Sequence, residues 1–277
     1  MGEHSSGSAA SSTLAPSASP KPVYAVGTLR YTSAGIIILF FWLLMGDFTL
    51  MVMESVMPQL LPLTLRDHNA SNQMIGILSM SMGAMLSMVF TPVISYRSDR
   101  HRGPRGRRIP YLLWPTPFIS LFLIVVGFCE EIGGALHGLL VPLFSNLQPS
   151  TVILITVGFA AAMYNFFNLF VTSVVFYLYN DVVPETLLGR FYGLFRVVGS
   201  LGGISFNLLL MPYAEHPAHR KWIYVIAGIF YCAAFMMMCF RVREGSYPPP
   251  EAPSRPGFFA AARTYLYECF SLPFYWC

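Results

Sequence analysis

Long apolar segments alternate with short polar loops over most of this chain. Six of them can be delimited, at residues 33–63, 74–94, 110–128, 151–177, 189–211 and 222–240. Each is close to or longer than the roughly 20 residues that an α-helix needs to cross the hydrocarbon core of a bilayer. The pattern therefore predicts six membrane-spanning helices and an all-α membrane protein.

The composition agrees with a chain that lies mostly in lipid. Of its 277 residues, 55% are hydrophobic and 11% are charged, whereas soluble domains have about 25% charged residues. The formal net charge of +4 does not indicate a nucleic-acid partner, because the basic residues gather in one loop and are not interleaved with aromatic residues. The partner that the composition predicts is the lipid bilayer.

The two ends of the chain differ from its apolar centre. Residues 1–31 are rich in Ser, Ala and Pro, which predicts a disordered cytoplasmic tail. Residues 32–241 are expected to form the six-helix bundle. Residues 242–277 predict a cytoplasmic linker stiffened by prolines, an amphipathic helix and the start of a truncated seventh helix. A further apolar stretch, 132–144, is too short to span and is expected at the outer interface of the membrane.

The loop between the second and third apolar segments decides the orientation. Residues 94–111 contain six arginines and a single acid, Asp99. Short loops rich in Lys and Arg stay in the cytoplasm. With this loop inside, 13 of the 17 Lys and Arg residues lie on the cytoplasmic side. The sequence predicts a multi-pass protein of the plasma (inner) membrane with both termini in the cytoplasm.

The same loop carries a family resemblance. Its Ser-Asp-Arg, Gly-Arg-Arg and Pro-Tyr elements follow one another between residues 98 and 111. This string resembles the loop between the second and third helices of major facilitator superfamily transporters. The spacing from Asp99 to Gly106 is similar to that of the glycoside–pentoside–hexuronide cation symporters and the sucrose transporters. The loop departs from the usual pattern at Ser95, where the family has Gly, and the arginines could also serve only to anchor the loop.

The resemblance implies a fold and an activity. The fold would be the six-helix N-terminal bundle of a major facilitator, a 3+3 inverted repeat with the second half absent. The activity would be secondary active transport of a sugar or glycoside by symport and alternating access. Alternatives are transport of another small organic solute, or an inert truncated half that needs a second six-helix half or a partner chain.

An enzyme is not expected from this sequence. Six-span proteases use a Gly-x-Ser-Gly nucleophile, whereas residues 199–202 read Gly-Ser-Leu-Gly, and all six histidines lie outside the apolar segments. The five cysteines show no zinc-binding spacing. No cofactor is predicted beyond a possible coupling proton. Sodium is less expected, because the second and fourth apolar segments contain no Asp or Glu between their ends.

Polar residues inside the apolar segments are candidates for substrate binding or proton coupling. An ionised carboxylate at the bilayer centre costs about 2.5–3.5 kcal/mol, so acids persist there when they face water, bind a ligand or take a proton. The alternatives are structural pairing between helices and, for the arginine, pairing with Asp47 or snorkelling to the surface. The candidates are Asp47, Glu54, Tyr164, Asn165, Asn168 and Arg196.

A second group of charged residues predicts a gate on the cytoplasmic side. Residues 180–196 are similar to the loop between helices four and five of the sugar-transporter families, and their acids are expected to reach the arginines of the basic loop. Such ion pairs would hold one conformation closed. The gate residues are Asp99, Arg100, Gly106, Arg107, Arg108, Asp181, Glu185 and Arg190.

Small residues recur at helical spacing on the second and fifth apolar segments. The fifth segment has Gly189 and Gly193 four residues apart, and then Gly199 and Gly203. Small residues at this spacing allow close helix packing. In the fold that the resemblance implies, these faces would be covered by the absent half.

Overall fold

The computed structural model describes residues 24–142 and 148–246, together with Arg263 and Tyr267. Within this part of the chain, six helical segments are long and apolar enough to cross a membrane, which confirms the predicted number. Most of these helical segments are longer than the apolar segments predicted from the sequence, because polar residues at their ends are also helical. Their bounds are Ser33–Asp67, Asn72–Arg100, Ile109–Gly127, Pro149–Val182, Glu185–Tyr213 and Pro217–Arg241.

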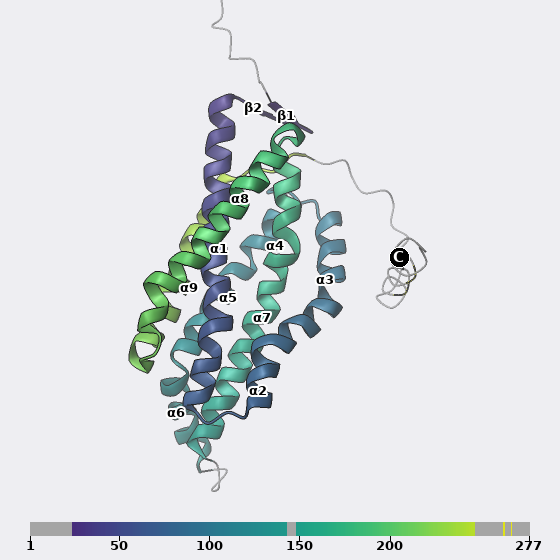
Figure 1. The fold of residues 1–277 in the computed structure, drawn as a ribbon. Helices are drawn as coiled ribbons and strands as arrows, with labels where there is room; N and C mark the ends of the chain where they lie inside the picture. Colours follow the sequence, from purple (N-terminus) through teal and green to yellow (C-terminus); the bar gives the residue numbers. More distant parts are fainter. Residues whose placement is uncertain (1–23, 143–147, 247–262, 264–266, 268–277) are drawn as a thin grey trace, which may run out of the picture.

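Three of the spans are single helices and three are interrupted (Figure 1). The single helices are α1 (Ser33–Asp67), α7 (Pro149–Val182) and α9 (Pro217–Arg241). The second span joins α2 (Asn72–Gly76), the π-helical turn η1 (Ile77–Ser81) and α3 (Met82–Arg100). The third joins α4 (Ile109–Leu113) and α5 (Pro115–Gly127), and the fifth joins α8 (Glu185–Ser205), η2 (Phe206–Leu210) and η3 (Met211–Tyr213). The break before Pro115 is expected, because proline has no N–H to continue the helical ladder.

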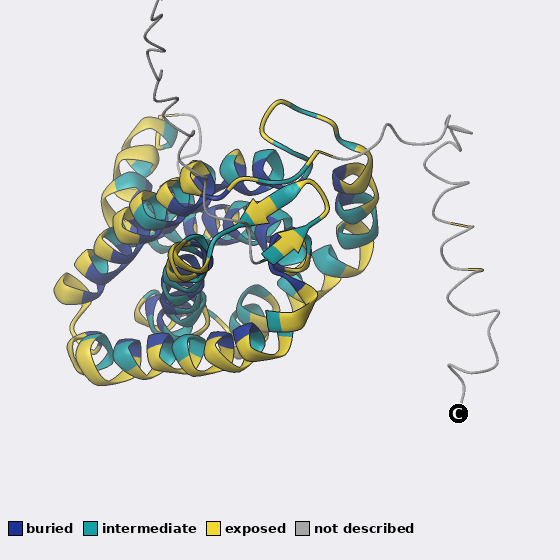
Figure 2. Ribbon diagram, turned by 90° about the horizontal axis from the view of Figure 1, so that it is seen from above, coloured by how far each residue is buried: buried dark blue, intermediate teal, exposed yellow. Residues whose placement is uncertain are grey.

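The spans pack side by side in a curved row. The order of contacts along the row is α8, α1, α9, α5, α7, α3, and α1 also touches α2, η1 and α7. The helices α3 and α8 are at the two ends of this row and are the least covered. The only buried residues of α3 are Ile94 and Ser98, and those of α8 are Phe191, Phe195 and Gly202. Figure 2 shows the exposed residues along the outer sides of the row.

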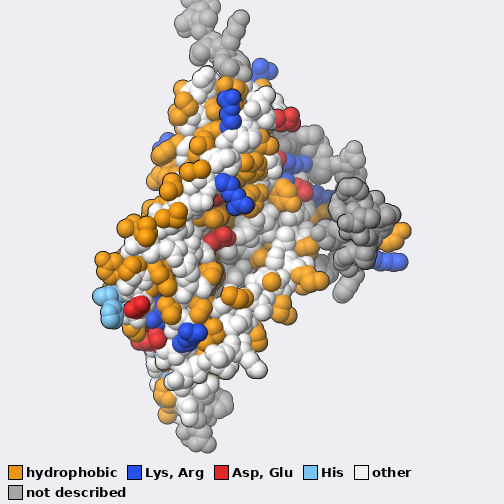
Figure 3. Space-filling model, in the orientation of Figure 1, with side chains coloured by type: hydrophobic (Ala, Val, Ile, Leu, Met, Phe, Trp, Pro, Cys, Tyr) orange, Lys and Arg blue, Asp and Glu red, His pale blue; other side chains and the backbone are white. Residues whose placement is uncertain are grey.

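Apolar side chains occupy both the inside and the outside of the bundle. Leu43, Leu60 and Val174 are fully buried, whereas Met88 and Leu208 are among the most exposed side chains of the described residues. Figure 3 shows hydrophobic side chains spread over one whole face. Helices that are apolar on all sides suit a lipid environment. The fold is that of an all-α multi-pass membrane protein.

Two short elements correct the predictions. The segment expected to be a disordered tail contains an antiparallel hairpin, β1 (Tyr24–Val26) and β2 (Leu29–Tyr31). Gly27 in its turn has a φ of 53°, which glycine adopts without steric cost. The apolar stretch after the third span is mostly helical and begins earlier than predicted, as α6 (Cys129–Leu140), which packs against α7. Residues 1–23 and almost all of the predicted linker and amphipathic helix lie outside the described residues.

Candidate functional site

The carboxyl group of Asp47, near the middle of α1, is enclosed by the bundle. Its side chain is 0% exposed, and neither oxygen has a hydrogen-bond partner among the described residues. Gly199 of α8 faces it so closely that a Cβ there would lie 3.2 Å from Oδ2. An ionised carboxylate without a partner is very costly in such surroundings. The enclosed position therefore suits the protonated, neutral form of the Asp47 carboxyl.

Glu54 lies seven residues further along α1 and has a different environment. It is only partly buried, and the side-chain amide of Asn168 on α7 is within reach of its carboxylate. The Oδ1 atom of Asn168 is buried and has no hydrogen-bond partner in the described part of the chain. The structure thus brings together Glu54 and Asn168 as two polar groups with unused hydrogen-bonding capacity.

The other two polar residues predicted on α7 make local contacts. The hydroxyl of Tyr164 is buried and donates to Sδ of Met53 at 2.5 Å. The amide of Asn165 donates to the backbone oxygen of Ala161 at 2.8 Å, and its Oδ1 points toward Gly83 on α3. Tyr164 therefore fills the α1–α7 contact, whereas Asn165 keeps part of its amide at the α3–α7 boundary.

Arg196 lies within the fifth span, as the sequence places it, and is exposed on α8. It does not pair with Asp47, whose oxygens have no hydrogen-bond partner among the described residues. The physical reason is that α8 ends the row of helices, so one whole side of it is uncovered. The buried cations among the described residues are Arg108 and Arg220, which are 3% and 4% exposed.

The end of the bundle with the basic loop contains a network of ion pairs. Asp181, at the end of α7, accepts from Nη2 and Nε of Arg107 at 2.6 and 3.0 Å. It also accepts from Nε of Arg108 at 3.2 Å. The guanidinium of Arg108 further donates to Asp99 and to Ser98 on α3. The expected contact between Asp181 and the arginines is confirmed, and it ties α3, α4 and α7 together.

The remaining predicted gate residues lie outside this network of ion pairs. Glu185 and Arg190 are exposed and belong to none of the ion pairs formed by the described residues, so their predicted place in the network is wrong. Both lie past the turn into α8, which leads away from the basic loop. Arg100 stacks over the ring of Tyr96 at 4.3 Å. Gly106 is required by its backbone, which has a φ of 101°.

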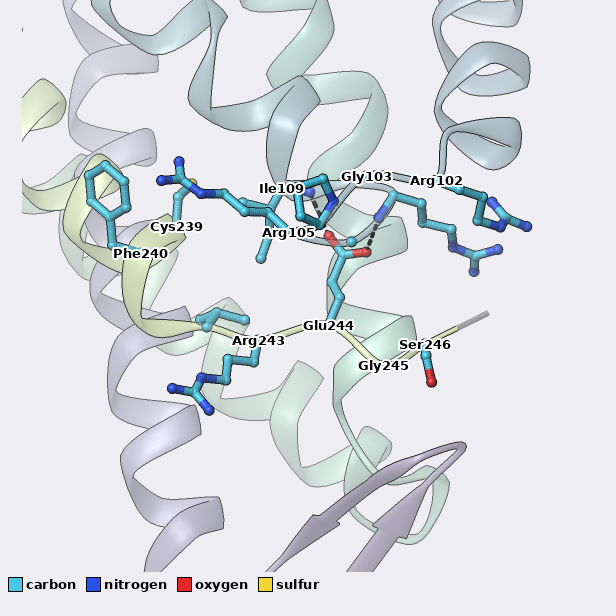
Figure 4. Close-up of a pocket in the computed structure, with 14 residues that line it drawn as sticks. Arg102, Gly103, Arg105, Ile109, Cys239, Phe240, Arg243, Glu244, Gly245 and Ser246 are labelled. Carbon is cyan, nitrogen blue, oxygen red and sulfur yellow. Dashed lines mark hydrogen bonds between the residues drawn. The ribbon is translucent and has the colours of Figure 1, made fainter. Parts of the chain in front are cut away.

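Glu244, in the segment after α9, is a residue of this network that the sequence did not predict. Its carboxylate accepts from the backbone N–H groups of Arg107 at 2.7 Å, Arg108 at 2.9 Å and Ile109 at 2.5 Å. Figure 4 shows this carboxylate pointing at the loop, and Glu244 and the loop together line a pocket of about 580 Å³. A Cβ at Gly106 would lie 2.6 Å from Glu244, so glycine also gives the carboxylate room. The sequence does contain a signal for this residue, because Glu244 is an acid next to the basic residues Arg241 and Arg243.

The opposite end of the bundle has ion pairs of its own. Arg220 of α9 pairs with Asp67 at the end of α1 and donates to a backbone oxygen at 2.9 Å. Lys221 pairs with Glu131 of α6 and lowers the pKa of that carboxyl. Burial raises the pKa of the nearby Cys129 thiol to about 11, so this thiol is unreactive. These contacts hold α1, α6 and α9 together at their ends.

Comparisons with family models, with curated proteins and with solved structures found no match to this chain. The resemblance to the major facilitator superfamily stays a prediction and depends on the residues of the two loops. The structure by itself establishes a multi-pass helical bundle with an enclosed acid at its centre and a charge network at one end.

Proposed function

We propose that this chain is a six-helix unit of a secondary active transporter that carries a sugar or glycoside by alternating access. The observation that supports it most is the carboxyl of Asp47, enclosed at the centre of the bundle without a partner. If Asp47 had a structural role, we would expect a hydrogen-bond donor beside its carboxyl. A carboxyl that gains and loses a proton during a transport cycle does not need a permanent hydrogen-bond donor.

Polar groups on α1 and α7 suit a polyhydroxylated solute. The carboxylate of Glu54 on α1 is within reach of the amide of Asn168 on α7, and the amide of Asn165 lies at the boundary of α7 with α3. Carboxylates and amides accept and donate hydrogen bonds to sugar hydroxyls. Another small polar solute would use the same groups, and this is the alternative within the same class.

The network around Asp181 is suited to a gate. It joins three helices at one end of the bundle through contacts that can break and re-form without disturbing the apolar core. On this proposal, neutralising Asp99 or Arg107 impairs the conformational cycle more than the affinity for substrate. An equal loss of both would count against a gate.

A unit with this shape suits a partner, because α8, at one end of the row, also carries glycines that face open space. At Gly189 and Gly193 on α8, a Cβ would meet nothing within 4 Å. We propose that a second six-helix half, in the same polypeptide or in a partner chain, covers α3 and α8. The coding sequence after Cys277 tests the first possibility, and a unit that transports without any added half would refute both.

The decisive experiment is uptake of labelled disaccharides by vesicles that contain the complete transporter, with and without a proton gradient. We expect gradient-driven accumulation, and we expect Asp47→Asn to abolish it while exchange of internal for external sugar continues. Glu185→Gln, outside the network, is the matched control and should transport normally. Failure to accumulate any sugar would remove the sugar hypothesis, and accumulation by Asp47→Asn would remove the role of Asp47.

A further inference from the structure

Two glycines of α8 make the closest part of its contact with α1. A Cβ at Gly202 would lie 3.0 Å from the backbone oxygen of Phe48, and a Cβ at Gly199 would lie 3.2 Å from Oδ2 of Asp47. Nearer the basic-loop end, the two helices meet through the rings of Phe191 and Phe40, with centroids 5.1 Å apart. Glycine lets two helix backbones approach closely. The backbones are therefore closest at Gly199 and Gly202, directly beside the enclosed acid.

Among the residues that the structure describes, none brings a positive charge to the carboxyl of Asp47. On α1 the nearest titratable group is Glu54, and on α7 it is Tyr179, whose buried hydroxyl also has no partner. The α9 side presents the thioether of Met238 against the glycine that precedes Asp47. On α8, Arg196 is exposed and forms no ion pair with the acid. The α1–α8 contact can therefore close over a neutral carboxyl but not over a charged one.

We propose that the proton on Asp47 controls the packing of α8 on α1, and that Gly199 is the positioning residue that holds α8 against this carboxyl. A neutral carboxyl tolerates the Cα of Gly199 as its neighbour. An ionised one needs water or a cation, which enters only when α8 separates from α1. This inference rests on the proposed function in one respect, that Asp47 is the group that takes and releases the proton.

A pair of cysteines can report the α1–α8 contact without any transport measurement. A Cβ at Gly203 would lie 3.8 Å from Oγ of Ser55, so cysteines at these two positions would face each other at cross-linking range. We combine Ser55→Cys and Gly203→Cys in a chain whose native cysteines are replaced. Oxidative cross-linking is then measured in lipid vesicles from pH 5 to pH 9, which covers about two pH units on either side of neutrality. Thiol chemistry itself changes with pH. A second pair, Ile124→Cys with Gly228→Cys between α5 and α9, corrects for it, because a Cβ at Gly228 would lie 3.3 Å from Cγ1 of Ile124.

The expected result is a cross-linking yield that falls as pH rises, relative to the control pair. Asp47→Asn, which mimics the neutral acid, should keep the yield high at every pH. Gly199→Ala should move the midpoint of the profile to lower pH by about one unit, because its methyl group displaces α8 and admits water to the carboxyl. Gly193→Ala adds the same methyl group to the same helix at a position that does not contact Asp47, and it should leave the midpoint unchanged.

A flat profile with Asp47 intact would overturn the proposal, and so would equal midpoints for Gly199→Ala and Gly193→Ala. If Asp47→Asn does not fold, these two comparisons still decide, since neither uses that variant. The measurement needs no substrate, so it separates the two hypotheses. A pH-dependent contact in a protein that transports nothing would refute the proposed function alone, whereas gradient-driven transport with a flat profile would refute this inference alone.

Discussion

Asp181→Asn is the substitution that most directly tests the charge network at the basic-loop end. It removes the negative charge that faces both Arg107 and Arg108 but keeps the shape of the side chain and one acceptor oxygen. Arg108 retains its contact with Asp99, so the network is weakened and not eliminated. The α7 end should then be held less firmly against α4.

The expected cost follows from burial. Removing one partner of a fully buried ion pair costs about 3–5 kcal/mol, and an exposed pair contributes about 1 kcal/mol or less. The side chains of Asp181 and Arg108 are 14% and 4% exposed, which is nearer the buried limit. Because Asn still accepts a hydrogen bond and Arg108 keeps a second acid, we expect a loss of about 2 kcal/mol.

The free energy of unfolding can be measured by titrating the protein from a mild detergent into sodium dodecyl sulfate. The control is Glu185→Gln, which removes an acid four residues further on that is exposed and outside the network. Its effect should stay within about 0.5 kcal/mol. If the two variants lose the same stability, the ion pairs at Asp181 contribute nothing measurable, and the gate proposal loses its physical basis.

Three further predictions concern the rest of the bundle. Glu244→Gln should cost about 1 kcal/mol and speed amide hydrogen exchange at residues 107–109, whose N–H groups lose a charged acceptor. Gly202→Ala should cost about 1 kcal/mol, because overpacking against Phe48 costs about 1–3 kcal/mol and better helix propensity returns up to about 1 kcal/mol. The lowered pKa of Glu131 stabilises the fold above its ordinary pKa of 4.5, and this contribution should disappear as pH falls through the folded value, with a small amplitude in unfolding measurements because the group is half exposed.

Each of these has its own comparison. If amide hydrogen exchange at residues 107–109 is as slow in the Glu244→Gln variant as in the unchanged protein, Glu244 does not hold the loop. Gly134→Ala on α6 should stabilise by about 0.5–1 kcal/mol, since a Cβ there meets nothing within 4 Å, and a loss as large as that of Gly202→Ala would refute the packing argument. Lys221→Met should remove the acid-dependent contribution of Glu131, and an unchanged pH dependence would assign that contribution to other acids.

The intramembrane residues show where prediction from sequence stopped. Asp47 and Glu54 were identified because an acid inside an apolar segment is expensive wherever the segment lies. The sequence could not say that Asp47 is enclosed and Glu54 only partly buried, or that Arg196 is exposed on α8. Those outcomes depend on which side of each helix has a neighbour. Hydropathy reports the environment of a helix as a whole, and for helices that are apolar all round it does not identify the covered side.

The sequence by itself determined the six spans, the position of the basic loop and the presence of acids within the bilayer, because hydropathy and charge act on each segment locally. The tertiary structure alone decided which distant groups meet. Asp181 reaches Arg107 across 74 residues, and Glu244 reaches the same loop across 137. Such contacts depend on the packing order of the helices. The recurring glycines of the fifth span indicate a face that packs closely, but they do not indicate which helix packs against it.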